Sequence, residues 1–354
     1  MKHKAPERFL VIRFRQMGDA VLATSLLNAI KRNFPDSETD FVLNERIAPL
    51  FEGHPAVDRI IAFSERERHS PLLYIRKIWR IMRRGRYDVI IDMRSTANTL
   101  PFSLLSPFSR FRIGIRKSYT KFVFNYRIPE CSPSTDMVSH DLSLLAPLGK
   151  CKSLQLDRDI SLALTPLELE FYKKRLVHCG VDLSRPVLLC GVVSKLDYKS
   201  WPRTSMTDVM RRLIADFPDL QLVFNYAPGH EAAVARGMYK DLGSPSNVFI
   251  NVQADSMREL VALASFCSGY FGNEGGARHI VHAVGRPSLV IVSPGINKVN
   301  WLPDTGIFAG GIACEDIVPA ENLAAMEHAE RYSAITPDYV YPLLQRFVKA
   351  HVMK

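Results

Sequence analysis

Short apolar runs alternate with stretches of helical apolar spacing along this chain, and the alternation occurs twice. Strands and helices that alternate in this way predict parallel sheets with helices on both faces. We therefore expect an α/β protein made of two doubly wound domains. The predicted strands cover residues 9–13, 39–43, 59–63 and 88–93 in the first set, and 186–193, 220–226, 247–252, 269–273 and 287–294 in the second.

The boundary between the predicted domains falls in a segment that contains several prolines. A length of 354 residues suits two domains of ordinary size. We predict a first domain over residues 1–183 and a second over 184–335. A last predicted helix, 338–352, lies in a terminal segment, 336–354, that could pack back on the first domain. The prolines between the two sets of strands are Pro129, Pro133, Pro147 and Pro166.

The positive charge of the chain is concentrated in its first half. Lys and Arg number 46 against 36 Asp and Glu, a formal charge of +10. Residues 1–150 hold 25 basic and 15 acidic side chains, whereas residues 151–354 hold 21 of each. An imbalance confined to one domain indicates that this domain faces an anionic partner.

Neither a leader peptide nor a membrane span is expected, because no window approaches 18 consecutive apolar residues. The cysteines show no CxxC or Cys/His spacing, which suits a reducing compartment and argues against structural zinc. We expect free thiols. The six are Cys131, Cys151, Cys179, Cys190, Cys267 and Cys314.

Neither half contains GxGxxG or GxxxxGK[ST], so a nicotinamide enzyme or a P-loop nucleotidase is disfavoured. The most unusual segment is 271–287, where a predicted strand ends at Glu274, Gly275 and Gly276 and a helix follows. Main-chain N–H groups at such a turn can bind a diphosphate, and glycine lets a ligand approach closely. Lys195 and Lys199, after another strand, could neutralise a phosphate.

A set of short motifs in fixed order gives the most specific signal. They are Met17-Gly18-Asp19, Lys199-x-Trp201-Pro202, Pro228-x-His230-Glu231, Glu274-Gly275-Gly276-x-x-His279 and Gly285-x-Pro287. Together these motifs resemble glycosyltransferase family 9, the ADP-heptose lipopolysaccharide heptosyltransferases. The resemblance implies the GT-B fold, in which two Rossmann-like domains face a cleft. It also implies inverting transfer of a heptose, or a related sugar, from an ADP-sugar to a hydroxyl of a lipopolysaccharide core or other lipid-linked glycan.

The same resemblance implies roles for individual residues. Asp19 falls on the catalytic base, and Lys199 on the lysine that contacts the phosphate and sugar of the donor. Ser194 falls on a hydroxyl residue near the diphosphate, and Glu231 on the acid that binds the adenosine ribose. No metal and no cofactor besides the nucleotide sugar is expected.

The turn at 274–279 falls on the Asp-Thr-Gly-x-x-His loop of the family, with His279 on its histidine. Two departures occur there, because Glu274 replaces the aspartate and Gly275 replaces the threonine. The longer acid and the missing hydroxyl leave the identity of the donor sugar open.

Each of these residues also has a plainer explanation when it is taken alone. Asp19 could cap a helix that starts near Val21, and Lys199 could be a solvated loop lysine. Glu231 could be a first-turn acid favoured by the helix dipole, and His279 could be a buried core histidine.

A basic run in the first half is interleaved with apolar residues at helical spacing. It could be a core-facing helix with a solvated basic face, or it could contact a phosphorylated acceptor or anionic lipid headgroups. No nucleic-acid motif accompanies the charge. Through the resemblance, we expect a cytoplasmic enzyme peripheral to the inner face of the cytoplasmic membrane. The candidate contact residues are Arg76, Lys77, Arg80, Arg83 and Arg84.

Two rival functions remain open at this point. A GT-B-like nucleotide-sugar epimerase would need no acceptor. A non-catalytic nucleotide-binding module at the membrane would bind the nucleotide and turn nothing over.

Overall fold

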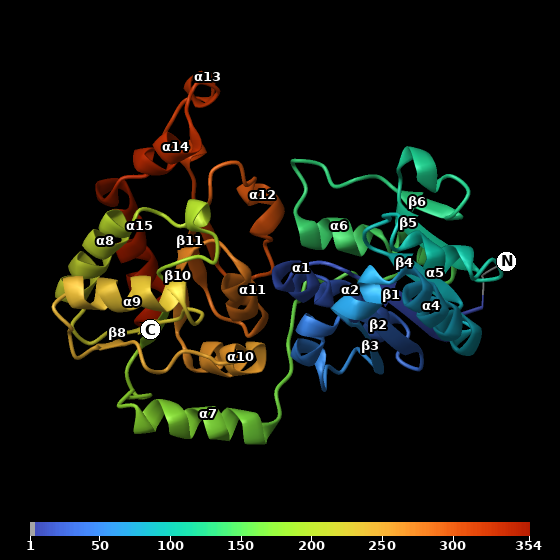
Figure 1. Cartoon of the computed structure of the whole chain (residues 1–354), viewed down its shortest axis with the longest axis horizontal. Coiled ribbons are helices and arrows are strands. Elements are labelled where there is room, and N and C mark those ends of the chain that lie inside the picture. Colours follow the sequence, from blue (N-terminus) through green and yellow to red (C-terminus); the bar gives the residue numbers. More distant parts are fainter. Residues whose placement is uncertain (1–3) are drawn as a thin grey trace. The chain divides into compact units, whose positions relative to one another are not determined.

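The computed structural model describes residues 4–354, which form two compact units (Figure 1). Unit 1 contains the described residues up to Ala163 together with Val299–Thr305, and unit 2 contains Leu164–Lys298 and Gly306–Lys354. The side chain of Asn300 holds the returning segment on unit 1, because its Nδ2 donates to the carbonyl of Thr135 at 2.6 Å. Within residues 4–354, no helix combines the length and the apolarity needed to cross a bilayer.

Unit 1 is built around a six-stranded parallel sheet in the order β3-β2-β1-β4-β5-β6. The strands are β1 (Arg8–Ile12), β2 (Glu38–Asn44), β3 (Arg59–Phe63), β4 (Val89–Asp92), β5 (Phe111–Ile115) and β6 (Tyr126–Ile128). The helices are α1 (Met17–Leu22), α2 (Thr24–Asn33), η1 (Glu45–Phe51), α3 (Glu65–His69), α4 (Pro71–Gly85), α5 (Leu100–Leu104), η2 (Ser118–Thr120), α6 (Met137–Ser143), η3 (Ala146–Lys150) and α12 (Lys298–Trp301), whose first residue belongs to unit 2.

Helices α4 and α5 cover one face of this sheet. Tyr74, Ile78 and Met82 recur every four residues on α4, so they lie on one side of the helix. Together with Phe102 of α5 they pack on Leu10, Ile12, Val42 and Ile90 of the strands. One side of the helix that carries the basic run is therefore core, as its helical spacing predicts.

Unit 2 contains a second parallel sheet, in the order β12-β11-β10-β7-β8-β9. The strands are β7 (Val187–Gly191), β8 (Gln221–Phe224), β9 (Val248–Phe249), β10 (Gly269–Asn273), β11 (Ser288–Ile291) and β12 (Ala309–Ile312). The helices are α7 (Pro166–His178), η4 (Asp197–Lys199), α8 (Arg203–Asp216), α9 (His230–Asp241), α10 (Met257–Phe266), α11 (Gly276–Ala283), η5 (Cys314–Asp316), α13 (Ala320–Leu323), α14 (His328–Ala334), α15 (Pro337–Phe347) and η6 (Val348–Val352).

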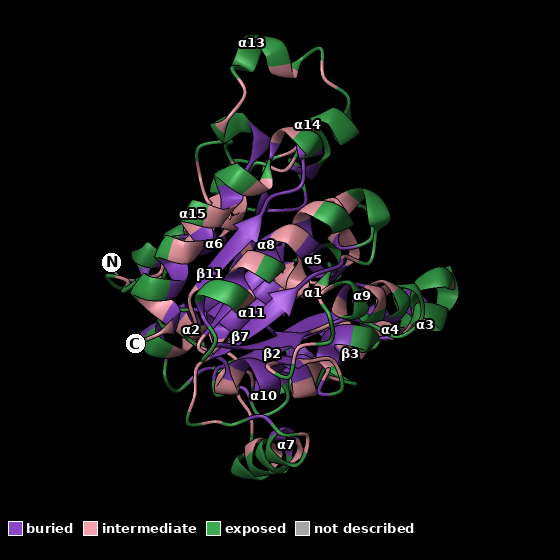
Figure 2. Cartoon of the chain, turned by 90° about the vertical axis from the view of Figure 1, so that its left-hand side faces the viewer, coloured by how far each residue is buried: buried purple, intermediate pink, exposed green. Residues whose placement is uncertain are grey.

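The central strands of both sheets are buried, and the outward sides of the helices are exposed. Figure 2 shows β2, β7 and β11 in the buried class, with α3, α7 and α13 mostly exposed. Central parallel strands covered on both faces read as continuous apolar runs, which is why they could be found in the sequence. These two sheets with flanking helices confirm the predicted α/β fold class.

The domain boundary lies earlier than the predicted division at 183–184. Helix α7 belongs to unit 2, since Arg175 on α7 pairs with Glu259 on α10 at 2.8 Å and Tyr172 donates to the carbonyl of Val252 at 2.7 Å. A helix that starts at the last of the boundary prolines and precedes the predicted boundary thus packs on α10 of unit 2. This long-range contact corrects the predicted boundary.

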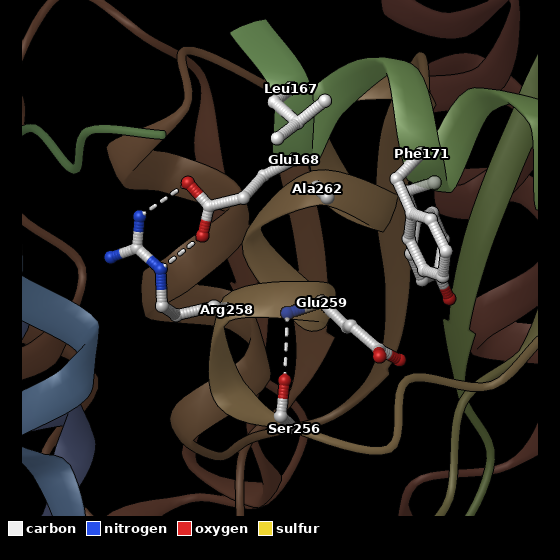
Figure 3. A pocket seen from close by; sticks show the side chains of 8 residues that line it. Leu167, Glu168, Phe171, Ser256, Arg258, Glu259 and Ala262 are labelled. Atoms are coloured by element: carbon white, nitrogen blue, oxygen red, sulfur yellow. Dashed lines mark hydrogen bonds and ion pairs between the residues drawn. The ribbon is translucent and has the colours of Figure 1, made fainter. Parts of the chain in front are cut away.

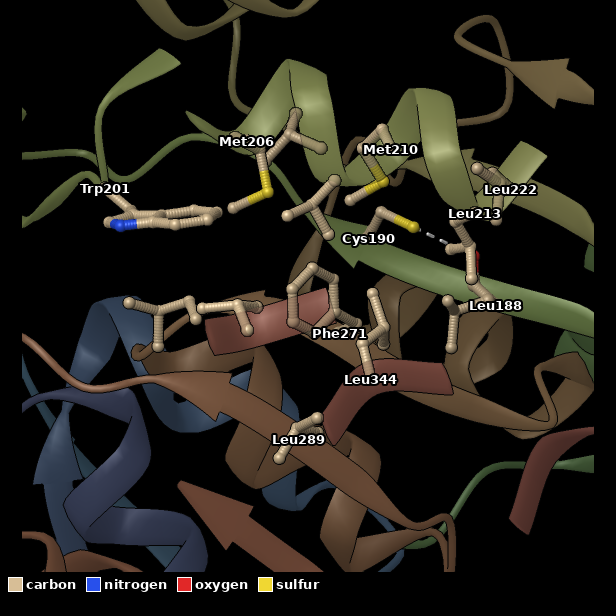
Figure 4. Packing of buried hydrophobic residues seen from close by; sticks show 14 of the residues in the cluster. Leu188, Cys190, Trp201, Met206, Met210, Leu213, Leu222, Phe271, Leu289 and Leu344 are labelled. Carbon is tan, nitrogen blue, oxygen red and sulfur yellow. Dashed lines mark hydrogen bonds between the residues drawn. The ribbon is translucent and has the colours of Figure 1, made fainter. Parts of the chain in front are cut away.

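The C-terminal segment also differs from its prediction. Helix α15 packs on α8 of unit 2, not on the first domain, and Leu344 lies in the same buried cluster as Phe271 and Met210 (Figure 4). Arg212 of α8 pairs with Asp338 at 2.7 Å, and Tyr341 donates to Asp216 at 2.5 Å. The apolar face of α15 therefore completes the core of the second unit.

Each sheet has one topological switch point, where the chain order reverses direction. In unit 1 the switch lies between β1 and β4, and in unit 2 it lies between β7 and β10. Loops that leave neighbouring strands in opposite directions open a crevice at the carboxyl ends of the strands. These two places are where a ligand is expected in each unit.

Candidate active site

Asp19 lies at the switch point of unit 1. It sits in the first turn of α1, directly after β1, and only 6% of its surface is exposed. Its Oδ1 pairs with Arg15 Nε at 3.1 Å and with Arg13 Nη2 at 3.4 Å. Because α1 starts at Met17 and has no side-chain cap, Asp19 does not cap this helix.

A second carboxylate lies behind the same arginine. Asp141 on α6 is fully buried, and its Oδ2 lies 3.6 Å from Arg13 Nη2. Neither of its oxygens accepts a hydrogen bond from any residue between 4 and 354. Arg13 is itself buried and donates to the carbonyl of Met93 at 3.2 Å. The guanidinium of Arg13 is thus shared between two carboxylates.

Burial raises the pKa of Asp19 above its ordinary value, because removal from water disfavours the charged form. The cations Arg13 and Arg15 oppose this shift, and Asp141 adds to it by like-charge repulsion. Arg94 at the end of β4 also lowers the pKa. A carboxylate with a raised pKa is a stronger base when it is ionised, which suits it to accept a proton from a hydroxyl.

In unit 2, the side chain of Asn273 connects three segments that lie at the ends of strands. It is the last residue of β10, and only 3% of its surface is exposed. Its Oδ1 accepts from the main-chain N–H of Trp201 at 2.7 Å, and its Nδ2 donates to the carbonyl of Gly191 at 3.0 Å. The end of β7, the loop that carries Lys199 and the turn at 274–276 are therefore held next to one another.

The loop after β7 carries Ser194 and Lys199, both half-buried. The main-chain N–H of Ser194 donates to Ser200 Oγ at 2.8 Å, which closes the loop. Asp197 in the same loop pairs with His230 at the start of α9 at 3.1 Å. The loops after β7 and β8 are thus joined across the surface of unit 2.

Glu231 lies in the first turn of α9, and its Oε2 accepts from the main-chain N–H of Ala227 at 3.0 Å. This bond shapes the turn that precedes the helix. Contact of Glu231 with the adenosine ribose stays a prediction.

The turn after β10 leaves its main chain open. A Cβ added at Gly275 would meet no atom within 4 Å, and Gly275 is the N-cap residue of α11, which has no side-chain cap. Gly272, at φ +150°, is different: a Cβ there would lie 2.4 Å from the carbonyl oxygen of Gly191, so glycine permits the close approach of β10 to β7. Half-buried Glu274 and Gly276 flank the open position. A helix start of this kind can bind an anion through its N–H groups.

His279 lies in the interior of unit 2 and is 2% exposed. Arg278, also buried, has its Nη2 2.8 Å from His279 Nδ1. Burial, together with Arg278 and His282, holds the pKa of His279 well below its ordinary value. The pKa of His282 is lowered to about 4 by burial and Arg278. His279 is therefore a neutral partner of Arg278, and its direct contact with the donor stays a prediction.

The sequence did not single out Arg13, Arg15, Asp141 or Asn273. Three of them had a usable signal, because Arg13, Arg15 and Asn273 sit at the carboxyl end of a predicted strand. Asp141 had none, since it reaches the site from a helix far along the chain.

Replacing Asn273 with alanine should lower the free energy of unfolding by about 2–4 kcal/mol, because it leaves a buried N–H and a buried carbonyl without partners. Thermal unfolding measures this loss. Asn251→Ala removes an exposed asparagine of the same unit and should change stability by less than about 0.5 kcal/mol. Equal stability of the two variants would show that the Asn273 bonds do not hold the loops.

Four of the five predicted basic contact residues form an outward face on α4. Arg76, Arg80, Arg83 and Arg84 are exposed, and none pairs with a carboxylate within residues 4–354. Lys77 is the exception, because its Nζ donates to Glu67 at 2.6 Å and lies 4.5 Å from the centre of the Phe63 ring. Contact of Lys77 with an acceptor or a membrane stays a prediction, as it does for the four arginines.

A pocket of about 500 Å³ lies between α7 and α10 of unit 2 (Figure 3). Arg258 and Glu168 form an ion pair at its edge. Its walls include Leu167, Phe171 and Ala262, and none of the predicted site residues lines it. Across residues 4–354, no group of three or more His, Cys, Asp or Glu side chains is arranged to hold a metal ion.

Comparisons with known proteins agree with the fold and with the family that the motifs resemble. The profile of glycosyltransferase family 9 (heptosyltransferase) matches residues 75–294. Lipopolysaccharide heptosyltransferase 1 of Campylobacter coli is 21% identical over 314 residues, which span 84% of this chain and 90% of that protein.

Two solved structures are similar along nearly their whole length. A family 9 glycosyltransferase of Veillonella parvula has a TM-score of 0.81 at 16% identity, covering 97% of this chain and 98% of that one. ADP-heptose lps heptosyltransferase II of E. coli has a TM-score of 0.73 at 18% identity, covering 97% and 99%. The profile spans more than half of the sequence, so the chain belongs to glycosyltransferase family 9, the heptosyltransferase family, and is a glycosyltransferase.

Proposed function

We propose that this glycosyltransferase transfers a heptose, or a related sugar, from an ADP-sugar to a hydroxyl of a lipopolysaccharide core or another lipid-linked glycan, with inversion. The observation that carries the proposal is the position of the candidate residues. Asp19 follows β1 at the switch point of one sheet, and Lys199 and the open turn at 274–276 follow β7 and β10 at the switch point of the other. One relative is named for ADP-heptose and lipopolysaccharide, which supports this donor and acceptor.

In the proposed reaction the acceptor oxygen attacks the anomeric carbon as the bond from that carbon to the diphosphate oxygen breaks. The electron pair of the broken bond leaves with the diphosphate, and the proton of the acceptor hydroxyl passes to Asp19. Lys199 and the N–H groups at the start of α11 neutralise the departing charge. Ser194, Glu231, Glu274, Gly275, Gly276 and His279 form the rest of the proposed donor site.

The chain's own residues supply both the base and the leaving-group charge in this scheme. No metal ion and no cofactor has a place in it. We place the enzyme in the cytoplasm, at the inner face of the cytoplasmic membrane, where a lipid-linked acceptor would be presented.

Product analysis tests the proposal. The chain is incubated with ADP-heptose alone, and then with ADP-heptose and a lipopolysaccharide core acceptor. Transfer predicts a glycosylated acceptor and free ADP only when both are present. Conversion of the donor without acceptor would favour a nucleotide-sugar epimerase, and binding without any product would favour a non-catalytic module. Calorimetry with ADP, UDP and GDP then identifies the nucleotide.

Replacing Asp141 with asparagine should move the acidic limb of the pH–rate profile to lower pH. The rate falls as pH drops through the pKa of the base, and the negative charge of Asp141 raises that pKa. Removing the charge therefore lowers the pKa of Asp19. The pH dependence of kcat measures this shift.

Asp136→Asn is a matched control, because Asp136 caps the same helix α6 but pairs with Arg158 at 2.9 Å. The acidic limb of the pH–rate profile of Asp136→Asn should not move. A limb that moves equally in both variants would argue that Asp141 acts only through the stability of the helix.

A further inference from the structure

Exposed apolar side chains gather in one stretch of unit 1. Among the described residues of this unit, eleven large apolar side chains are exposed, and nine of them lie within residues 71–122. Phe108 is 97% exposed and Phe122 is 89% exposed. Side chains of this size are rarely left in water together unless the surface meets a partner.

Part of this surface is the outward side of α4. Leu72, Ile75 and Trp79 are exposed on it, between the arginines at 76, 80, 83 and 84. The guanidinium of Arg83 lies 5.0 Å from the centre of the Trp79 ring. The inward side of the same helix is core, so α4 presents an apolar and basic face to solvent.

The remaining part is formed by two loops that the fold holds together. Arg112 donates to the carbonyl of Pro107 and, at 3.0 Å, to the carbonyl of Val123, so Phe108 and Phe122 each neighbour a residue bound by this guanidinium. Ser109 Oγ donates to the carbonyl of Tyr87 at 2.6 Å, which fixes the first loop at the end of α4. Helices α4 and α5 cover the same face of the sheet (Figure 1).

The charge of residues 71–122 is strongly positive. Residues 71–122 hold 12 Lys and Arg and two acids, a difference of +10 that equals the formal charge of the whole chain. Of the two acids, Asp92 is fully buried and Asp88 accepts main-chain hydrogen bonds from Glu7 and Arg8. The exposed aromatic rings therefore lie among cations, with Lys121 Nζ 5.7 Å from the centre of the Phe122 ring.

We propose that the outward side of α4 and the loops that carry Phe108 and Phe122, here called the docking face, bind the surface of a lipid bilayer that contains anionic lipid. Aromatic and aliphatic side chains enter the boundary between headgroups and acyl chains, and the arginines neutralise lipid phosphates. A bilayer fits both properties at once, whereas a soluble anion would leave the apolar side chains in water. The choice of a membrane as partner rests on the lipid-linked acceptor of the proposed function.

The test uses the full chain and vesicles, without donor or acceptor. We expect flotation with vesicles of phosphatidylcholine and phosphatidylglycerol, and much weaker flotation with phosphatidylcholine alone. Phe108→Ser combined with Phe122→Ser should weaken binding about tenfold or more. Arg83→Gln combined with Arg84→Gln should weaken it about tenfold and reduce its sensitivity to salt.

Matched controls lie on α7 of unit 2. Leu167→Ser with Phe171→Ser removes two exposed apolar side chains, and Lys173→Gln with Lys174→Gln removes two exposed cations. Both control variants should bind vesicles as the parent chain does. Lipids brominated on their acyl chains should quench tryptophan emission of the parent chain, and Trp79→Phe should remove most of that quenching.

Three results would overturn the docking face: no binding to anionic vesicles, equal binding to neutral vesicles, or binding that the Phe108 and Phe122 changes leave intact. A dimer in light scattering that these changes dissociate would also overturn it, in favour of a second copy as partner. Sugar transfer to a delipidated acceptor without vesicle binding would contradict the docking face and leave the proposed function standing. Vesicle binding without sugar transfer from any ADP-sugar would support the docking face and contradict only the proposed function.

Discussion

Asp19→Asn is expected to lower the rate of sugar transfer about 10²- to 10⁴-fold, the usual contribution of a general base. Asparagine keeps the size of the side chain and removes its ability to take a proton. The affinity for ADP should hardly change, because the proposed nucleotide site lies in unit 2. Steady-state kinetics and calorimetry on the same preparation measure both quantities.

Asp36→Asn is the control for this change, since Asp36 is an exposed aspartate of the same unit. It should transfer sugar as the parent chain does. Parent-level turnover of Asp19→Asn would exclude Asp19 as the base. Loss of ADP affinity in the same variant would instead indicate damage to the fold.

Lys199→Ala is expected to reduce kcat about 10²- to 10³-fold, the range found when one group that stabilises developing charge is removed. It should also weaken the binding of ADP and of the ADP-sugar, because the lysine is proposed to contact their phosphates. The measurements are initial rates at saturating donor and calorimetric titration with ADP.

Lys195 provides a close control for Lys199. It lies four residues earlier in the same loop and is more exposed. Lys195→Ala removes the same charge from nearly the same place and should change ADP affinity only slightly. If the two variants lose equal affinity, the loop acts through its general charge and Lys199 has no specific phosphate contact.

Most strands of this fold could be read from the sequence because they are buried on both faces. The apolar run at 269–273 coincides with β10, whose five residues are all buried. Strands β5, β6 and β12 were missed. β6 has three residues and β12 reads AGGI, so neither gives the apolar run or the β-branched composition that marks a strand.

The candidate site was predictable where a motif follows a strand directly. Asp19, Lys199 and the turn at 274–276 all lie at the ends of central strands, as the loop pattern indicates. The partners that set their surroundings were harder to find, because Asp141 and Asn273 act through contacts between segments far apart in the chain. Sequence spacing carries no direct record of such contacts.

The placement of α7 and α15 shows the same difficulty at the level of domains. Both helices have clear sequence signals, since each begins with a proline directly after a threonine cap. Which sheet a helix packs on depends on the match between its apolar face and a distant core, as with Leu344 and Phe271. Local sequence patterns determine where a helix forms, but they do not determine which sheet it packs on.

The seven residues Val299–Thr305, which leave unit 2 and return to it, restrict how this chain can be recombined. Unit 2 is made from two separate stretches, so a graft of the nucleotide half from a relative requires three junctions, after Ala163, Lys298 and Thr305. A single-crossover chimaera joined after Ala163 would import the foreign 299–305 segment, and Asn300 would then have to match the Thr135 carbonyl of the host. Domain-exchange experiments on this enzyme should therefore transfer α12 together with unit 1, although α12 lies in the second half of the sequence.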